Sequence, residues 1–209
     1  MKFEEAVAEV PIVAILRGVT PSTVLTVAEA LVSAGVRVVE VPLNSPEPLE
    51  SISRLAREFS ARMVCGAGTV LNSNGVDLVY QAGGTLVVTP NTDLDVIARC
   101  VGSDMTVIPG FVTPTEAFAA LQAGTKYLKL FPAGNLGPGY LKALNSVLPK
   151  DTAVFAVGGI GATDLPAWRA AGASGFGIGS ELFTPGIDAA EVHRRAVTLV
   201  RACQQALTR

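Results

Sequence analysis

The chain alternates between short runs of apolar residues and longer stretches in which apolar and polar residues recur with a helical period. Each apolar run is followed by a turn rich in Gly, Pro, Asn or Thr and then by an amphipathic segment. The runs are apolar on both faces, which is typical of parallel strands buried between a core and a layer of helices. The pattern occurs eight times and predicts strands at residues 11–16, 37–42, 63–66, 85–89, 104–108, 126–131, 153–157 and 174–178.

Several of the intervening helices have recognisable ends. Thr20-Pro21 and Thr113-Pro114 each place a capping residue before a proline that suits the first helical position. Glu116 lies three residues after Thr113 and completes the pattern of a capping box. The last helix is expected at about residues 188–207. Glycines that suit the C-terminal ends of helices precede four predicted strands, at Gly35, Gly83, Gly124 and Gly172.

Eight strand–helix units predict a (β/α)₈ barrel, with residues 1–209 forming a single α/β domain. An open, doubly wound sheet is the alternative, and it would bind its ligand at one switch point of the strand order. The candidate functional residues described below lie at the ends of most predicted strands. Their distribution favours the closed barrel.

The amino-acid composition excludes several classes of function. About half of the 209 residues are hydrophobic and 16% are charged, with a formal net charge of -2, which argues against binding nucleic acid. The cysteines at 65, 100 and 203 have no metal-binding spacing, and the one histidine, His193, is expected on a solvated helix face. Neither a signal peptide nor an apolar stretch of membrane-spanning length is visible. We therefore expect a soluble, cytoplasmic protein with no metal, no cofactor and no membrane partner.

Lys129 is the most informative residue. The chain has five lysines, and only Lys126 and Lys129 lie in a predicted strand. Because side chains alternate along a strand, Lys129 shares a face with Tyr127 and Phe131, which we expect to point into the barrel. Apolar surroundings disfavour the charged amine, lower its pKa and leave a nucleophile. The alternative is a buried lysine that is paired with a carboxylate.

Three more polar residues follow or end strands on the side where barrels carry their chemistry. Glu40 is a candidate general acid/base, or the ion-pair partner of a nearby cation. Arg17 is a candidate for binding a substrate carboxylate, or for a salt bridge across the barrel mouth. Thr69 offers a hydroxyl group beside glycine-rich backbone that a ligand can approach.

The last two strands end in Gly158-Gly159 and Gly179-Ser180. Barrels of this kind commonly bind phosphate after strands seven and eight, through backbone N–H groups and a short extra helix. Residues 180–183 are expected to supply that helical turn. Tight turns also require glycine, so these pairs alone leave both interpretations open.

Five segments of the chain, read together, resemble the class I 2-keto-3-deoxy-6-phosphogluconate and 6-phosphogalactonate aldolases. They are IVAILRG at 12–18, VEVPLNSP at 39–46, GAGTV at 66–70, VTPN at 88–91 and LKLFP at 128–132, and the likeness extends over about residues 11–201. The resemblance implies a homotrimeric barrel that uses no metal and cleaves a 2-keto-3-deoxy-6-phosphosugar acid to pyruvate and glyceraldehyde 3-phosphate. It assigns Lys129 to the Schiff base, Glu40 to acid/base catalysis, Arg17, Thr69 and Pro90 to the pyruvate side, and Gly158, Gly159, Gly179 and Ser180 to the phosphate.

Two positions resemble the galactonate branch of that family. Asn44 stands where the gluconate enzymes typically carry Arg, and Val157 stands where they carry Thr. Loss of a hydroxyl group near C4 of the substrate should weaken recognition of one C4 epimer, so we favour 2-dehydro-3-deoxy-6-phosphogalactonate. The alternatives are its C4 epimer 2-dehydro-3-deoxy-6-phosphogluconate, or 4-hydroxy-2-oxoglutarate. Other classes are an isomerase or epimerase with Glu40 as base, and a non-catalytic phosphosugar-binding barrel.

Overall fold

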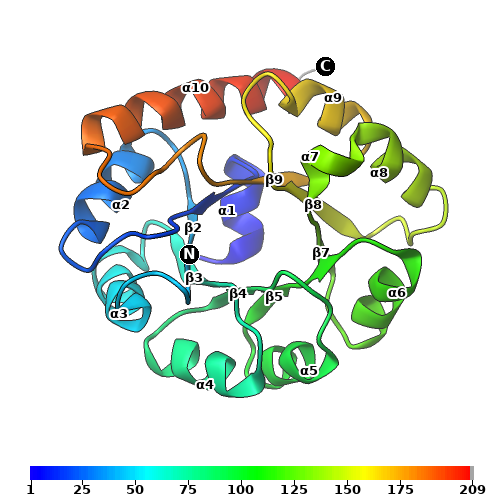
Figure 1. Cartoon of the computed structure of the whole chain (residues 1–209), viewed down its shortest axis with the longest axis horizontal. Coiled ribbons are helices and arrows are strands. Elements are labelled where there is room, and N and C mark those ends of the chain that lie inside the picture. The colour runs from blue at the N-terminus through cyan, green and yellow to red at the C-terminus, as the bar shows by residue number, and fades with distance from the viewer. Residues whose placement is uncertain (208–209) are drawn as a thin grey trace.

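The computed structural model describes residues 1–207, and in this range nine parallel strands form one sheet. Their order is β5-β4-β3-β2-β1-β9-β8-β7-β6, and because β5 and β6 are consecutive in the chain, the sheet curls into a barrel ringed by helices (Figure 1). The predicted barrel is therefore confirmed. The strands are β1 (Ile12–Ile15), β2 (Val38–Pro42), β3 (Val64–Gly68), β4 (Leu86–Val88), β5 (Thr106–Ile108), β6 (Gly110–Phe111), β7 (Tyr127–Leu130), β8 (Ala153–Val157) and β9 (Gly175–Ile178).

The ninth strand arises because the fifth position of the barrel is built from two pieces. Pro109 separates β5 from β6, and proline has no N–H group to donate to a strand ladder. β5 pairs with β4 on one side, while β6 pairs with β7 on the other. The carbonyl oxygen of Pro109 accepts a 2.8 Å hydrogen bond from the backbone of Lys129, so the interrupted position still joins its neighbours.

Helices cover the outside of the barrel, and the main ones are α2 (Val24–Ser33), α3 (Pro48–Phe59), α4 (Ser73–Gln81), α5 (Leu94–Gly102), α6 (Pro114–Gln122), α8 (Pro138–Leu144), α9 (Leu165–Ala170) and α10 (Ala189–Leu207). A single turn, α7 (Ala133–Leu136), precedes α8. The capping box at α6 is confirmed, because the Thr113 N–H donates to Glu116 Oε2 at 2.7 Å and the Thr113 hydroxyl group accepts the Glu116 N–H. No helix between residues 1 and 207 has the length and hydrophobicity to cross a membrane.

The predicted start of the first covering helix is wrong by three residues. Residues 20–23 form a turn, and α2 begins at Val24. The Thr20 hydroxyl group is engaged with the hydroxyl groups of Ser22 and Thr23, at 2.9 and 3.0 Å, and does not cap the helix. The four glycines predicted after helices do adopt positive φ angles, between +85° and +103°.

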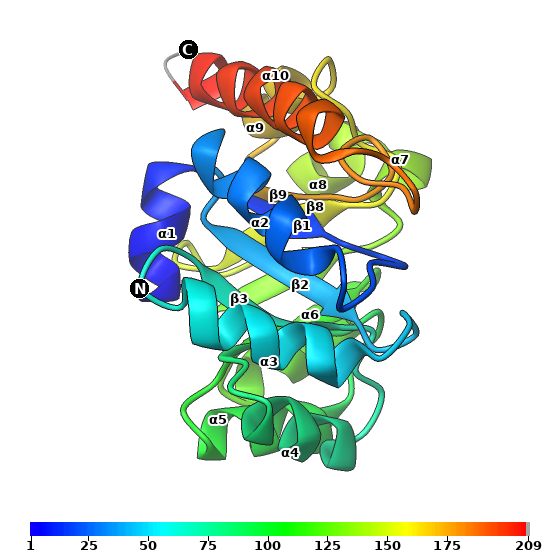
Figure 2. The ribbon, with the colours of Figure 1, turned by 90° about the vertical axis from the view of Figure 1, so that its left-hand side faces the viewer.

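One helix that the hydrophobic pattern did not predict, α1 (Phe3–Glu9), covers the N-terminal end of the barrel. Figure 1 shows α1 inside the ring of helices, and Figure 2 shows it at one end of the barrel. The Phe3 ring lies 4.9 Å from the Tyr127 ring and 5.9 Å from the Phe155 ring. The Tyr127 hydroxyl group donates to Glu4 at 2.8 Å. Aromatic side chains thus fill the N-terminal end of the barrel interior.

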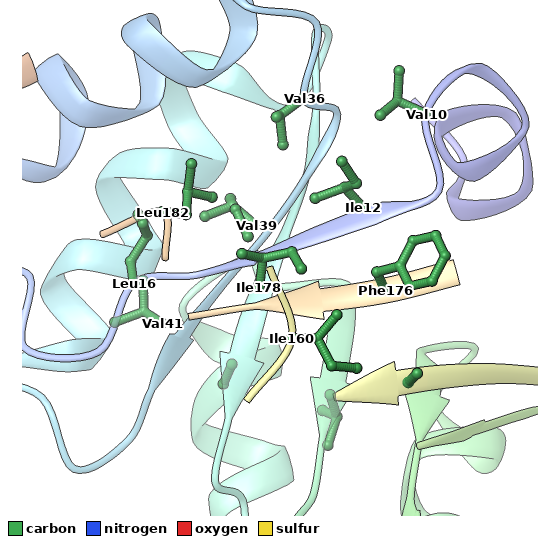
Figure 3. Close-up of a cluster of buried hydrophobic side chains, with 14 of the residues drawn as sticks. Val10, Ile12, Leu16, Val36, Val39, Val41, Ile160, Phe176, Ile178 and Leu182 are labelled. Carbon is green, nitrogen blue, oxygen red and sulfur yellow. The ribbon is translucent and has the colours of Figure 1, made fainter. Parts of the chain in front are cut away.

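Alternation along the strands separates two apolar layers. The larger layer lies between the sheet and the helices, and Figure 3 shows the part of it around Ile12, Val39 and Ile178. The smaller layer fills the barrel interior and includes Val38 and Phe155. Since residues two apart in a strand share a face, Glu40 and Lys129 point into the interior, above this apolar floor.

Candidate active site

A cavity of about 210 Å³ opens at the C-terminal ends of the strands. It receives a side chain or backbone group from almost every strand of the barrel. The residues expected from the sequence that line it are Arg17, Glu40, Thr69, Pro90, Lys129, Val157, Gly158, Gly159, Gly179 and Ser180. Residues that the sequence did not single out as site residues also line it, namely Ile15, Phe131, Ile160, Gly177 and Glu181.

Lys129 extends from β7 into this cavity and is 6% exposed. Its Nζ lies 4.7 Å from the centre of the Phe131 ring. Burial lowers the pKa of Lys129, the charge of Glu40 acts to raise it, and the positive charge of Arg17 lowers it further. A larger fraction of the amine is therefore neutral and nucleophilic than for a solvated lysine.

Glu40 extends from β2 and is 2% exposed. Burial raises its pKa from 4.5 to about 7, and the positive charges of Lys129 and Arg17 only partly oppose this effect. Among residues 1–207, Glu40 Oε2 has no hydrogen-bond partner, and no ion pair joins Glu40 to Lys129. The carboxyl group can therefore gain or lose a proton near neutral pH, as an acid/base group must.

Gly68, at the end of β3, provides the space that Glu40 occupies. A Cβ atom at position 68 would lie 1.9 Å from Glu40 Oε2. A glycine in a strand often marks such a close approach, and this was the available signal in the sequence. The contact itself depends on the pairing of β2 with β3, which sets Gly68 beside Pro42 and the strand carrying Glu40.

The structure corrects the expected position of Asn44. Asn44 does not line the cavity; its Oδ1 atom accepts a 2.6 Å hydrogen bond from Arg17 Nη1. On the other side, Arg17 Nη2 lies 3.4 Å from the Thr69 hydroxyl group. Thr69 itself has a φ of +56°, a value that L-residues rarely adopt. Asn44 and Thr69 therefore hold the guanidinium group of Arg17 at the cavity wall.

The two glycine pairs follow β8 and β9 and line the cavity on the side of these strands. Gly158 and Gly159 have φ angles of +96° and +69°. Within residues 1–207, the backbone N–H groups of Gly158, Gly159, Gly179 and Ser180 donate no hydrogen bond to the protein. Unpaired N–H groups that border one cavity are suited to binding an anion.

The turn expected at residues 180–183 is present and is closed by hydrogen bonds. The N–H groups of Leu182 and Phe183 both donate to the carbonyl oxygen of Gly179, at 2.9 Å. These bonds do not continue into a helix, because residues 183–188 lead away to α10. Any phosphate site here must use the turn itself.

Among the described residues, no three His, Cys, Asp or Glu side chains are grouped so that they could hold a metal ion. The expectation of a solvated His193 is wrong: this residue is half-buried, and its Nδ1 lies 3.1 Å from the carbonyl oxygen of Ala30 in α2. The ring therefore helps to pack α10 against α2.

The barrel thus holds a buried amine and a buried carboxyl group in one cavity, an arrangement typical of enzyme active sites. The chain matches the model of the KDPG and KHG aldolase family over residues 3–197, and it belongs to that family. It is 45% identical to the 2-dehydro-3-deoxy-6-phosphogalactonate aldolase of Escherichia coli (strain K12) over 199 residues, covering 95% of this chain and 97% of the relative. It is 35% identical to the 2-dehydro-3-deoxy-phosphogluconate aldolase of Zymomonas mobilis, covering 67% and 66%.

Solved structures agree with this assignment. A native KDPGal structure superposes with a TM-score of 0.95 at 44% identity, covering 96% of this chain and 98% of the other. A KDPG aldolase from Legionella pneumophila, with pyruvate captured as a covalent carbinolamine, superposes with a TM-score of 0.79 at 25% identity, covering 95% of each chain.

Proposed function

We propose that this chain is a class I aldolase that cleaves 2-dehydro-3-deoxy-6-phosphogalactonate to pyruvate and glyceraldehyde 3-phosphate. The observation that carries the proposal is the placement of Lys129, an amine with a lowered pKa, in the same cavity as Glu40. Neither group has a structural ion-pair partner in the described part of the chain that would explain its burial. Buried ionisable groups of this kind are retained for chemistry.

The reaction begins when the neutral Lys129 amine attacks the C2 ketone and forms a carbinolamine. Protonated Glu40 donates its proton to the C2 hydroxyl group, water leaves, and an iminium ion forms. The pKa of about 7 allows Glu40 to be protonated at this step and ionised at the next. The iminium ion then withdraws electrons from the bond between C3 and C4.

Cleavage follows when the Glu40 carboxylate takes the proton of the C4 hydroxyl group, directly or through one water molecule. The C4 oxygen forms the aldehyde of glyceraldehyde 3-phosphate, and the electrons of the broken C3–C4 bond form an enamine. Glu40 returns its proton to C3, and water hydrolyses the resulting iminium ion to pyruvate and free Lys129, with the proton released by this hydrolysis returning to Glu40. Protons and electrons balance without an external oxidant or metal.

We assign the two ends of the substrate to two parts of the cavity lining. Arg17, held by Asn44 and Thr69, is placed to bind the carboxylate beside the reacting ketone. The N–H groups of Gly158, Gly159, Gly179 and Ser180 are placed to bind the terminal phosphate. A phosphate anchored away from the reacting bond supplies binding energy that orients C2 toward Lys129.

The choice of C4 epimer is supported by Val157, an apolar side chain that lines the cavity and offers no hydrogen bond to a C4 hydroxyl group. The relatives with 45% and 41% identity are both named for the galactonate substrate. We expect kcat/KM to be higher for the galactonate compound than for its gluconate epimer, with 4-hydroxy-2-oxoglutarate poorer than either because it has no phosphate. A clear preference for the gluconate epimer would contradict the role of Val157.

The decisive experiment is borohydride reduction in the presence of pyruvate, followed by peptide mapping. We expect one adduct, on Lys129, and a matched Lys126→Met variant should be trapped equally well because Lys126 is exposed at the other end of the strand. An isomerase or a binding barrel would give no adduct. Trapping on any other lysine would refute the assignment of Lys129.

We also propose that the enzyme is a cytoplasmic homotrimer. Large apolar side chains are exposed on the outer surface, among them Leu71, Leu94 and Phe118. A structure that is 45% identical, with a TM-score of 0.93, is a protein cage designed by fusing symmetric oligomeric domains. Light scattering should give three times the chain mass of 21.5 kDa; a monomer would contradict the proposal.

A further inference from the structure

The turn that follows β9 separates the active-site cavity from a second, larger cavity. This outer cavity has a volume of about 560 Å³ and lies between the turn and α10, where Arg194, Arg195 and Thr198 line it. Ser180 and Glu181 line both cavities. The peptide unit between Ser180 and Glu181 therefore borders both cavities.

Arg195 contacts this peptide unit from the outer side. Its Nη1 atom lies 3.3 Å from the carbonyl oxygen of Ser180, and its Nε donates to Glu191 Oε1 at 2.6 Å. Glu191 is fixed in turn, because its side chain is only 20% exposed and its N–H donates to Asp188 at the start of α10. The guanidinium group is thus held between the helix and the turn.

The geometry of a trans peptide unit links this contact to the active site. The 180–181 bond is trans, since the cis bond of the described chain is at Phe131-Pro132. In a trans unit the carbonyl oxygen and the N–H group point in opposite directions. With the Ser180 oxygen directed at Arg195, the N–H group of Glu181 points away from Arg195. This N–H has no acceptor among residues 1–207, and Glu181 lines the active-site cavity.

We propose that Arg195 is a positioning residue for phosphate recognition: it orients the peptide unit between Ser180 and Glu181 so that the Glu181 N–H joins the neighbouring N–H groups around the phosphate. This inference rests on the proposed function, in which this part of the cavity lining binds the phosphate. Glu191 pairs with both Arg194 and Arg195, but only Arg195 contacts the Ser180 oxygen, so orientation of the peptide unit rather than charge distinguishes Arg195. Arg195 itself does not touch the substrate.

The test compares Arg195→Gln with Arg194→Gln. Arg194 is the matched control, because it pairs with the same Glu191 but is 77% exposed and makes no contact with Ser180. For Arg195→Gln we expect about a tenfold rise in the KM of the phosphorylated substrate and in the Kd of inorganic phosphate measured by calorimetry. For Arg194→Gln we expect changes within about twofold, as for other surface substitutions. Arg195→Lys, which retains a cationic donor, should recover most of the loss.

The rate of borohydride trapping with pyruvate separates a positioning role from general damage, because pyruvate carries no phosphate. This rate should stay within about twofold of the wild type in every variant. Three outcomes would overturn the inference. They are equal losses of pyruvate trapping and phosphate affinity, unchanged phosphate affinity in Arg195→Gln, and failure of both position-195 variants to fold. If wild-type protein is not trapped with pyruvate, the proposed function fails, whereas the phosphate calorimetry still tests Arg195.

Discussion

The two ends of the barrel interior are filled in opposite ways. At the N-terminal end, Phe3 packs against Tyr127 and Phe155, and the Tyr127 hydroxyl group has its partner in Glu4. At the C-terminal end, Glu40 and Lys129 lie in the cavity without an ion pair between them in the described chain, and Glu40 Oε2 has no hydrogen bond.

This difference separates the part of the interior that stabilises the fold from the part that serves chemistry. Burying an aromatic side chain is favourable, and a buried hydroxyl group with a partner costs little. Burying a carboxyl group without a partner is unfavourable, and the raised pKa of Glu40 expresses that cost. Substitutions at the N-terminal end should therefore change stability, and substitutions at the C-terminal end should change activity.

The largest expected effect is on the activity of Lys129→Met. Removal of the amine to which we assign the Schiff base should lower kcat/KM by about 10⁵-fold, the scale seen when a catalytic nucleophile is deleted. Because methionine fills similar space in an apolar interior, the free energy of unfolding should not fall by more than about 1 kcal/mol. Steady-state kinetics and urea unfolding measure the two quantities. A large loss of stability would place Lys129 among the structural residues instead.

Glu40→Gln should reduce kcat by about 10³-fold, within the range for loss of a general acid/base. The pH profile of the wild type should show an inflection near the Glu40 pKa of about 7, and this inflection should be absent from the variant. Glu4→Gln is the matched control at the other end of the barrel, where the carboxylate only accepts a bond from Tyr127. If Glu4→Gln lowered kcat as much, the two ends would not differ in function.

At the N-terminal end, Phe3→Ala should lower the free energy of unfolding by about 3 kcal/mol, because it leaves a cavity against two aromatic rings. The folded variant should retain kcat within about twofold. Phe3→Leu, which fills most of the space, should cost less than about 1.5 kcal/mol. A fall in kcat without a change in stability would show that α1 acts on the active site.

Much of this arrangement could be predicted from the sequence, because its signals are local. The period of the apolar residues predicted the strands, and the position of Lys129 within one of them predicted its inward direction. The predicted helix start at Thr20-Pro21 was wrong because the Thr20 hydroxyl group bonds to neighbouring hydroxyl groups. A capping pattern does not reveal this competition. α1 was missed because it has only seven residues, and its burial depends on side chains more than a hundred residues away.

The sequence alone could not predict the contacts of Asn44, Gly68 and Arg195, for a related reason. Each acts through a contact between segments distant in the chain: Asn44 on Arg17, Gly68 on Glu40, and Arg195 on Ser180. Residue type and spacing indicate that such a residue matters, but the pairing of strands and the packing of helices decide which group it meets.

The burial of Glu40 also predicts how stability changes with pH. Between 4.5 and about 7 the folded protein holds the Glu40 proton more tightly than the unfolded chain does. Folding is thus favoured below this window, and the advantage is lost as the pH rises through the folded-state pKa. The difference in unfolding free energy between wild type and Glu40→Gln should decline across the window, as measured by urea unfolding at several pH values. A rise instead would mean that Glu40 is ionised and paired in the folded state.

The smallest expected effect is that of Asn44→Ala. It distinguishes support of Arg17, which the structure shows, from the substrate contact predicted by the sequence. If Asn44 supports Arg17, Asn44→Ala should weaken pyruvate binding by about tenfold through loss of a charge-assisted hydrogen bond, measured as the pyruvate concentration for half-maximal borohydride trapping. Asn44→Asp keeps the acceptor oxygen and should bind pyruvate nearly as well as the wild type. If Asn44 contacts the sugar, Asn44→Ala should instead change the ratio of kcat/KM for the two C4 epimers and leave pyruvate binding intact. Pyruvate has no C4, so a defect with pyruvate alone assigns Asn44 to the support of Arg17.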